Sequence, residues 1–133
     1  MAIRYRITKR SNSIQQKKEQ YIMQAVHTGK IDIDLVSKAI SDECSLHEVD
    51  VKAVLMALGI KLEYFLEKGN IVDLGDVGKF KMGFQCVAEE DAEKLSPKRS
   101  IKKYHINFQP SIKLKRKLKA GITTYKEGSR SVG

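Results

Sequence analysis

The stretch KGNIVDLGDVGKFKMGF, residues 68–84, decides which fold this chain is expected to adopt. It opens with a Gly-Asn break directly after a long helical pattern, runs through a short apolar strand, and turns at Gly75-Asp76. In the strand that follows, large apolar side chains alternate with lysine, glycine and glutamine. A period of two indicates that one face packs on a core while the other faces solvent or a partner. The stretch therefore predicts a helix that leads into a hairpin with a basic outer face.

Two helices are expected before this stretch. The first runs from an Asp32 cap to about Glu43, with apolar residues at helical spacing. The second starts at Ser45, whose spacing to Glu48 is that of a capping box, and it reaches about Lys68. This second helix is apolar around most of its girth, so it must be buried on several sides, which one small chain scarcely supplies. The pattern favours a dimer packed around the helix, and a buried central helix in a monomer is the alternative.

Shorter elements are expected on both sides of this body. Alternating apolar and basic residues predict a strand at 3–8, and an apolar run predicts another at 21–26, with a polar loop between them. After the hairpin, an acidic-then-basic segment at 88–100 leads into a third alternating strand that ends at Pro110. Residues 112–119 then form a short basic helix held by leucines four residues apart.

Length and composition are those of one domain, with 133 residues of which 41% are hydrophobic. We expect an N-terminal extension with short strands at 1–31, a main domain at 32–120, and a flexible basic tail at 121–133. The chain holds no run of 18 apolar residues, and its first residues lack the apolar core of a secretory signal. The sequence therefore predicts a cytoplasmic protein with no membrane partner.

The net charge of +9 is concentrated at the two ends of the chain. The first 18 residues carry +6 and residues 97–133 carry +10, whereas the middle carries −7. Basic ends on a mildly acidic scaffold indicate a directional positive surface that attracts polyanions. The alternative is an ordinary solvated face with disordered basic ends.

Catalytic and metal-binding patterns are weak. Cys44 and Cys86 are the only cysteines, which favours buried free thiols in a cytosolic chain and leaves a disulfide as the alternative. Cys44 and His47 have half of a zinc-site spacing, but no second half follows. The chain has neither a P-loop nor a G-x-G-x-x-G motif. We expect no enzyme activity, cofactor, metal or small-molecule substrate.

The helix pair followed by GNIVDLGDVGKF, residues 69–80, resembles the bacterial histone-like DNA-binding family of the HU and integration-host-factor type. The resemblance continues where Phe108, Pro110, Leu114 and Lys115 match the closing strand and short basic helix of that family. It covers about residues 32 to 119, so the first strands look like the N-terminal extension of a larger HU-like variant. The resemblance implies an α+β fold. Two helices would be followed by an antiparallel sheet with an arm-like extension and a short C-terminal basic helix, in an intertwined dimer of the nucleoid.

The chain departs from the family pattern at several positions. Ser111 stands where the family usually has glycine, and Ile112 where a phosphate-contacting lysine often sits. The arm lacks the Arg-Asn-Pro wedge that kinks DNA, and Glu89-Glu90-Asp91 would repel phosphates there. Pro97-Lys98-Arg99 is either a plain turn or a minor-groove contact. The sequence therefore predicts DNA binding but gives no support for bending by intercalation.

The expected partners are double-stranded DNA and a second copy of the chain. Phosphate neutralisation by lysine and arginine would supply the affinity, with little sequence specificity because no side chains are arranged to read base edges. The predicted DNA-binding residues are Lys79, Lys81, Lys98, Arg99, Lys102, Lys103, Lys113, Lys115, Arg116 and Lys119. The predicted dimer core consists of Val54, Leu58, Leu62, Phe65, Phe80 and Phe108. Two alternatives are an RNA- or ribosome-associated basic protein, and a protein-interaction module that kept the fold but lost DNA binding.

Overall fold

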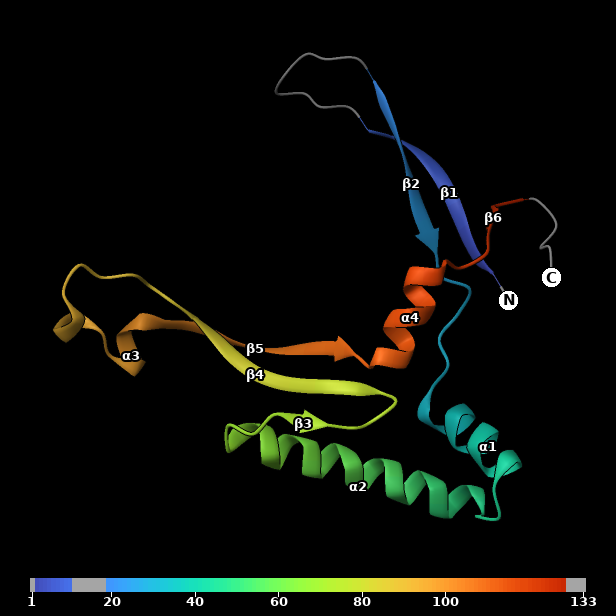
Figure 1. Ribbon diagram of the computed structural model, residues 1–133, viewed down its shortest axis with the longest axis horizontal. Helices are drawn as coiled ribbons and strands as arrows, with labels where there is room; N and C mark the ends of the chain where they lie inside the picture. The colour runs from blue at the N-terminus through green and yellow to red at the C-terminus, as the bar shows by residue number, and fades with distance from the viewer. Residues whose placement is uncertain (1, 11–18, 129–133) are drawn as a thin grey trace. The chain divides into compact units, whose positions relative to one another are not determined.

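The computed structural model describes residues 2–10 and 19–128, and Figure 1 shows its helices and strands. The chain divides into two compact units. One unit is Met1–Asp32 together with Lys117–Gly133, and the other is Ile33–Arg116. Most of the polar loop predicted between the first two strands, and the end of the predicted tail, lie outside the described residues.

The first unit is a three-stranded sheet built from both ends of the chain. Strands β1 (Ile3–Arg10) and β2 (Gln20–Val26) pair antiparallel, and β6 (Thr124–Lys126) pairs parallel with β1. The order is therefore β2-β1-β6. The predicted strands at the N-terminus are present. The prediction of a flexible tail is wrong at Thr124–Lys126, because this segment joins the sheet through backbone pairing that its side-chain pattern does not reveal.

An ion pair links the residue that follows β6 to strand β1. The Arg6 guanidinium donates to both carboxylate oxygens of Glu127, at 2.8 Å from Nε and 2.7 Å from Nη2. The Glu127 N–H also donates to the Tyr5 carbonyl at 2.8 Å. The hydrogen bonds from Arg6 hold the pKa of Glu127 below its ordinary value, and Glu127 raises the pKa of Arg6.

The second unit begins with two helices, α1 (Ile33–Glu43) and α2 (Glu48–Glu67). The predicted capping box at Ser45 is wrong, because the extended residue before α2 is His47. Glu48 is thus the first helical residue and not the third, where a capping box needs it. Acidic residues in the first turn, Glu48 and Asp50, instead favour the positive end of the helix dipole.

The end of α2 is set by the Gly-Asn break. Gly69 has φ of 86°, and its N–H donates to the Leu66 carbonyl at 3.0 Å. The Asn70 N–H donates to the Phe65 carbonyl at 3.1 Å. These two bonds form a Schellman motif, which satisfies the last carbonyls and turns the chain toward the sheet.

The sheet of the second unit has the order β3-β4-β5, with antiparallel pairing throughout. Its strands are β3 (Val72–Asp73), β4 (Gly78–Cys86) and β5 (Ile101–Pro110). Strand β5 leads into the basic helix α4 (Ile112–Ala120), which continues from the second unit into the first. The strands and the basic helix that the sequence predicts here are therefore present.

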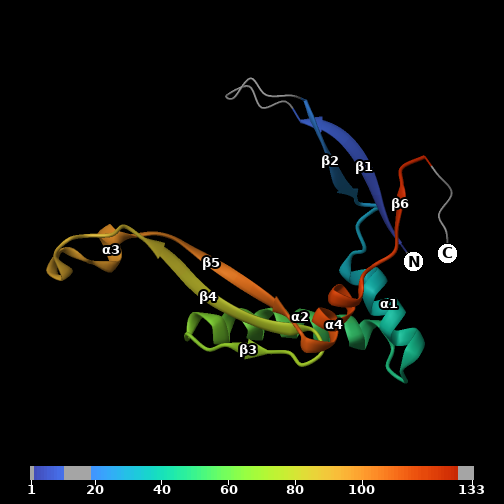
Figure 2. The same cartoon turned by 45° about the horizontal axis from the view of Figure 1, so that its top comes forward.

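Strands β4 and β5 form a ribbon that extends past the end of α2, as both views show (Figures 1 and 2). Its far end carries a short 3₁₀ turn, η1 (Ala92–Lys94), and the four-residue helix α3 (Pro97–Ser100). The Asp91 carboxylate caps η1 by accepting from the Glu93 N–H at 3.1 Å. Pro97 is the first residue of α3, a position that suits its fixed φ and missing N–H.

Few apolar side chains are buried by a single chain. Among the described residues, only Val51 and Leu66 are hydrophobic and buried, at 4% and 2% exposure. Both lie on α2, whose other apolar residues are largely exposed. Cys44 and Cys86 are free and exposed, so the prediction of buried thiols is wrong for the chain by itself. No helix in the described ranges is long and apolar enough to cross a membrane.

Candidate nucleic-acid interface

One face of the β4–β5 ribbon is polar and free of acidic residues. In an antiparallel pair, directly opposed residues point to the same face, so the register determines what each face carries. The opposed pairs on the polar face are Lys79 with Gln109, Lys81 with Asn107, Gly83 with His105, and Gln85 with Lys103. This face, the polar ribbon face, thus combines three lysines with four other hydrogen-bonding side chains.

The other face of the ribbon is apolar and aromatic. Phe80 opposes Phe108 with ring centroids 4.9 Å apart, and Phe84 opposes Tyr104 with centroids 6.0 Å apart. Phe108 is nevertheless 48% exposed and Phe80 only half-buried in the single chain. The alternation expected from the sequence therefore separates the two faces.

Lys102 differs from its neighbour Lys103 in its pairing with β4. The pairing of β4 with β5 shifts between Gln85 and Cys86, so Cys86 opposes Ile101 and no residue of β4 opposes Lys102. An extra residue at such an irregularity is re-aimed relative to the regular alternation. Of these two predicted DNA-binding lysines, the register therefore pairs only Lys103 with a residue of the polar ribbon face.

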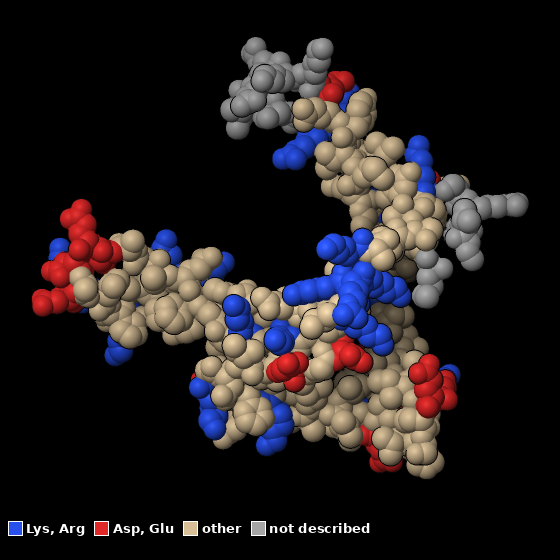
Figure 3. All heavy atoms as spheres, viewed as in Figure 1, with Lys and Arg blue, Asp and Glu red and all other residues tan. Residues whose placement is uncertain are grey.

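Helix α4 carries five basic residues and no acidic one. Its start is capped by Ser111, whose Oγ accepts from the Leu114 N–H at 3.1 Å and whose carbonyl accepts from Lys115 N–H at 2.9 Å. The serine that departs from the family glycine thus has a structural role here. Figure 3 shows Lys and Arg side chains gathered at α4. Lys119 lies in its last turn, beyond Arg116, where the second unit ends.

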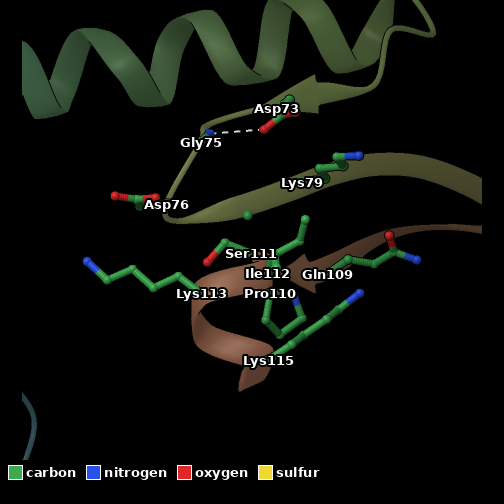
Figure 4. Close-up of a pocket in the computed structure, with 11 residues that line it drawn as sticks. Asp73, Gly75, Asp76, Lys79, Gln109, Pro110, Ser111, Ile112, Lys113 and Lys115 are labelled. Atoms are coloured by element: carbon green, nitrogen blue, oxygen red, sulfur yellow. Dashed lines mark hydrogen bonds between the residues drawn. The ribbon is translucent and has the colours of Figure 1, made fainter. Parts of the chain in front are cut away.

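A cleft of about 320 Å³ brings together residues from the β3–β4 turn and the start of α4 (Figure 4). Three predicted DNA-binding residues line it, Lys79 from β4 and Lys113 and Lys115 from α4. Asp73 and Asp76 line it too. The Asp73 carboxylate is engaged in the turn, where its Oδ1 accepts from the Gly75 N–H at 2.9 Å.

The remaining predicted DNA-binding residues lie at the other end of the ribbon. Lys98 and Arg99 are on α3, in the segment that also carries the acidic residues of η1. Figure 3 shows acidic side chains gathered at this end of the arm. The structure thus separates a basic region around α4 from a mixed-charge arm end.

Several neighbours of the lysines are not among the predicted site residues. His105, Asn107 and Gln109 alternate on the polar ribbon face, and Ser111 caps the helix beside it. Their alternation was visible in the sequence, but the pairing that puts each of them next to a β4 residue was not. Within the described residues, no group of three His, Cys, Asp or Glu side chains is placed to hold a metal ion.

The helix pair, the small antiparallel sheet and the basic last helix place the protein in the class of HU-like domains. More particularly, the chain belongs to the HU-HIG family, described as an HU domain fused to a wHTH, Ig or glycine-rich motif, which it matches over residues 1–126. The resemblance noted in the sequence is thereby confirmed.

A solved structure with a similar fold is a candidate bacterial DNA-binding protein from Bacteroides vulgatus. The TM-score is 0.66 at 12% sequence identity, so the likeness shows a shared mixed α+β fold. The alignment covers 98% of this chain and 50% of the other, so this chain spans half the length of that protein. No curated protein matches the sequence.

Proposed function

We propose that this protein binds duplex DNA as a homodimer, through phosphate contacts with little sequence specificity. The observation that carries the proposal is the acid-free polar ribbon face, continued by an acid-free helix α4. Membership of an HU-like family supports DNA as the polyanion. The expected location is the nucleoid, and the expected DNA-binding body is the domain at 32–120.

Phosphate neutralisation is the proposed source of affinity. Lysines at alternate positions of β4 lie about 7 Å apart on one face, so Lys79 and Lys81 can contact separate phosphates. Lys113 and Lys115 extend the positive surface at the cleft. Each contact releases condensed counterions from the duplex, which makes binding favourable at low salt and weak at high salt.

Low sequence specificity is proposed from the residue types on this face. The polar ribbon face holds lysine, asparagine, glutamine and histidine but no arginine, the side chain that most often reads guanine in the major groove. Asparagine and glutamine in a minor groove distinguish little more than A·T from G·C. Shape and backbone contacts would therefore dominate recognition.

The homodimer is proposed from the apolar side of α2 that the single chain leaves exposed. At 3.6 residues per turn, Val54, Leu58, Leu62 and Phe65 share one side of α2, next to the buried Val51. Val54 is 61% exposed, Phe65 41% and Leu58 38% in the single chain. An apolar side of this extent on a 20-residue helix is typical of a surface that a second copy covers.

Binding of a short duplex should fall steeply as salt is raised. For each phosphate contact, log K is expected to lose about 0.9 per unit of log salt concentration. Lys79→Gln and Lys81→Gln should each weaken binding similarly for unrelated sequences and reduce the slope by about one contact per copy. Fluorescence anisotropy over a salt series measures both quantities.

Lys61→Gln provides the control, because it removes one positive charge from α2, outside the β4–β5 pairing. It should leave the slope unchanged. Absence of duplex binding at low salt would contradict the proposal. Tighter binding to duplex RNA or to single strands, in a parallel gel shift, would favour the RNA-associated alternative.

Bending is expected to be small because the arm end carries acidic residues and Pro97 starts a helix. End-labelled duplexes should therefore keep nearly the same end-to-end distance when the protein binds, as measured by energy transfer. A large shortening would show that this arm kinks DNA without the Arg-Asn-Pro wedge.

A further inference from the structure

Strand β2 forms an outer edge of the first sheet. The order β2-β1-β6 leaves one side of β2 without a neighbouring strand among the described residues. Its pairing with β1 runs without a register shift from Arg4 opposite Val26 to Arg10 opposite Gln20. A regular edge of this kind presents a row of backbone N–H and C=O groups to any strand that approaches.

This edge lacks the features that normally block further pairing. The β2 sequence, QYIMQAV, contains no charged residue and no proline. The other long edge strand, β5, carries Lys102, Lys103 and Pro110, together with the irregularity at its start. Strands β3 and β6 are only two and three residues long. Among the described outermost strands of the two sheets, β2 alone is long and has neither a charged residue nor a proline to oppose edge-to-edge pairing.

The side chains on one face of β2 are apolar and open. Met23 opposes Ile7, and Tyr21 and Met23 point to the same face because they are two residues apart. Tyr21 is 66% exposed, Met23 62% and Ile7 47%. A strand added at the β2 edge would place its own side chains beside this apolar row.

We propose that the added strand is β2 of a second copy, paired antiparallel about a two-fold axis at Met23. Met23 would oppose Met23 of the second copy, and Tyr21 would oppose Ala25. The two sheets would become one continuous sheet, with an apolar row running across the junction. Both exposed edges are satisfied at once, which is the advantage of an isologous contact.

The charge distribution favours the uncharged β2 of a second copy over a basic strand at this edge. It permits this pairing even though each chain carries a net charge of +9. No charged side chain lies on β2, so none opposes another across the junction. The arginines and lysine of β1 would be separated from those of the second copy by three strand spacings, about 14 Å. That distance exceeds the screening length of about 8 Å at physiological ionic strength.

The proposed contact is separate from the α2 surface and does not depend on DNA binding. On DNA, this contact would hold the duplex-binding bodies of two copies together and raise their effective concentration.

Disulfide mapping tests the register directly. In a Cys44→Ser, Cys86→Ser background, Met23→Cys should form a covalent dimer when oxidised glutathione is added. Two thiols would lose two protons and two electrons, and the glutathione disulfide would be reduced to two thiols. Directly opposed residues have Cα atoms about 4.5 or 5.5 Å apart, within the range that a disulfide spans.

Tyr21→Cys is the matched control in the same background. Two copies of this variant would place the cysteines about 13 Å apart along the strands, too far for a disulfide. A mixture of Tyr21→Cys with Ala25→Cys should instead form the mixed dimer. Equal cross-linking of Met23→Cys and Tyr21→Cys homodimers would overturn the proposed register.

Met23→Lys tests the association without a cross-link. It places like charges opposite each other across the junction and should raise the dissociation constant of this contact roughly fivefold to tenfold. Light scattering over a concentration series should show a lower mass than for the unchanged protein, with the same circular dichroism. Unchanged masses would contradict the proposal. Binding of an acidic peptide to the β2 edge, without displacement of a second copy, would also contradict it. Duplex affinity at low protein concentration should stay unchanged, so a loss of DNA binding would bear on the proposed function and not on this edge.

Discussion

Replacing Gly78 by alanine is expected to lower the free energy of unfolding by about 3–5 kcal/mol, combining backbone strain with overpacking. Gly78 has φ of 141°, a conformation that residues with a side chain rarely adopt. A Cβ atom there would lie 2.3 Å from the Gln109 carbonyl oxygen and 2.6 Å from Cε2 of Phe108. Neither neighbour can move freely, because Gln109 is in the strand ladder and Phe108 packs on Phe80.

Denaturant unfolding at a fixed protein concentration measures the effect, since any association would shift the midpoint with concentration. Gly83→Ala is the control in the same strand. Its Cβ would lie 2.9 Å from Nε2 of His105, the far end of a side chain that can rotate away. We expect a loss below about 1 kcal/mol there. Similar losses for the two variants would show that β5 does not approach Gly78 as closely as the structure has it.

The second large effect is expected on α2. Val54→Asp should raise the dissociation constant of the proposed homodimer by at least about 100-fold, because an unpaired carboxylate in an apolar interface costs several kcal/mol. Val54 is 61% exposed in the single chain, so in a monomer the same change would alter stability by only about 0.5 kcal/mol. The substitution therefore separates a dimer from a monomer.

Analytical ultracentrifugation provides the measurement. Ile60→Asp is the matched control, because it also lies in the middle of α2, is 67% exposed, and is turned well away from Val54 by the helical period. It should change the dissociation constant by less than about tenfold. A monomeric unchanged protein, or a Val54→Asp variant that dimerises normally, would contradict the proposed interface.

Local periodicity explains why so much of the fold could be predicted. Alternation of apolar with polar residues identified strands β1, β4 and β5, because opposite faces of a strand meet different environments. The Gly-Asn pair at 69–70 predicted the end of α2, because a left-handed residue is cheapest for glycine. The same alternation predicted the lysines of the polar ribbon face.

Features that depend on chain segments far apart in sequence could not be predicted in this way. The start of α2 is a local exception, because its N-cap is His47 and not the predicted Ser45, and a capping box is only one of several ways to begin a helix. The pairing of β6 with β1 joins residues more than a hundred positions apart, and a three-residue strand carries almost no periodic signal. The register shift at Lys102 arises because β5 has one more residue than β4 at this point of the pairing. The sequence of either strand alone does not show this difference.

The sequence by itself determined the order of the helices and strands other than η1, α3 and β6, the lysine-bearing face of β4 and the absence of acid in α4, because these follow from local spacing and composition. Only the tertiary structure decided which side chains meet. It brought Lys79 together with Lys113 and Lys115 at one cleft, and left β2 as an open edge. The physical reason is that register and strand order are fixed by backbone pairing between distant segments, which side-chain periodicity within one segment does not encode.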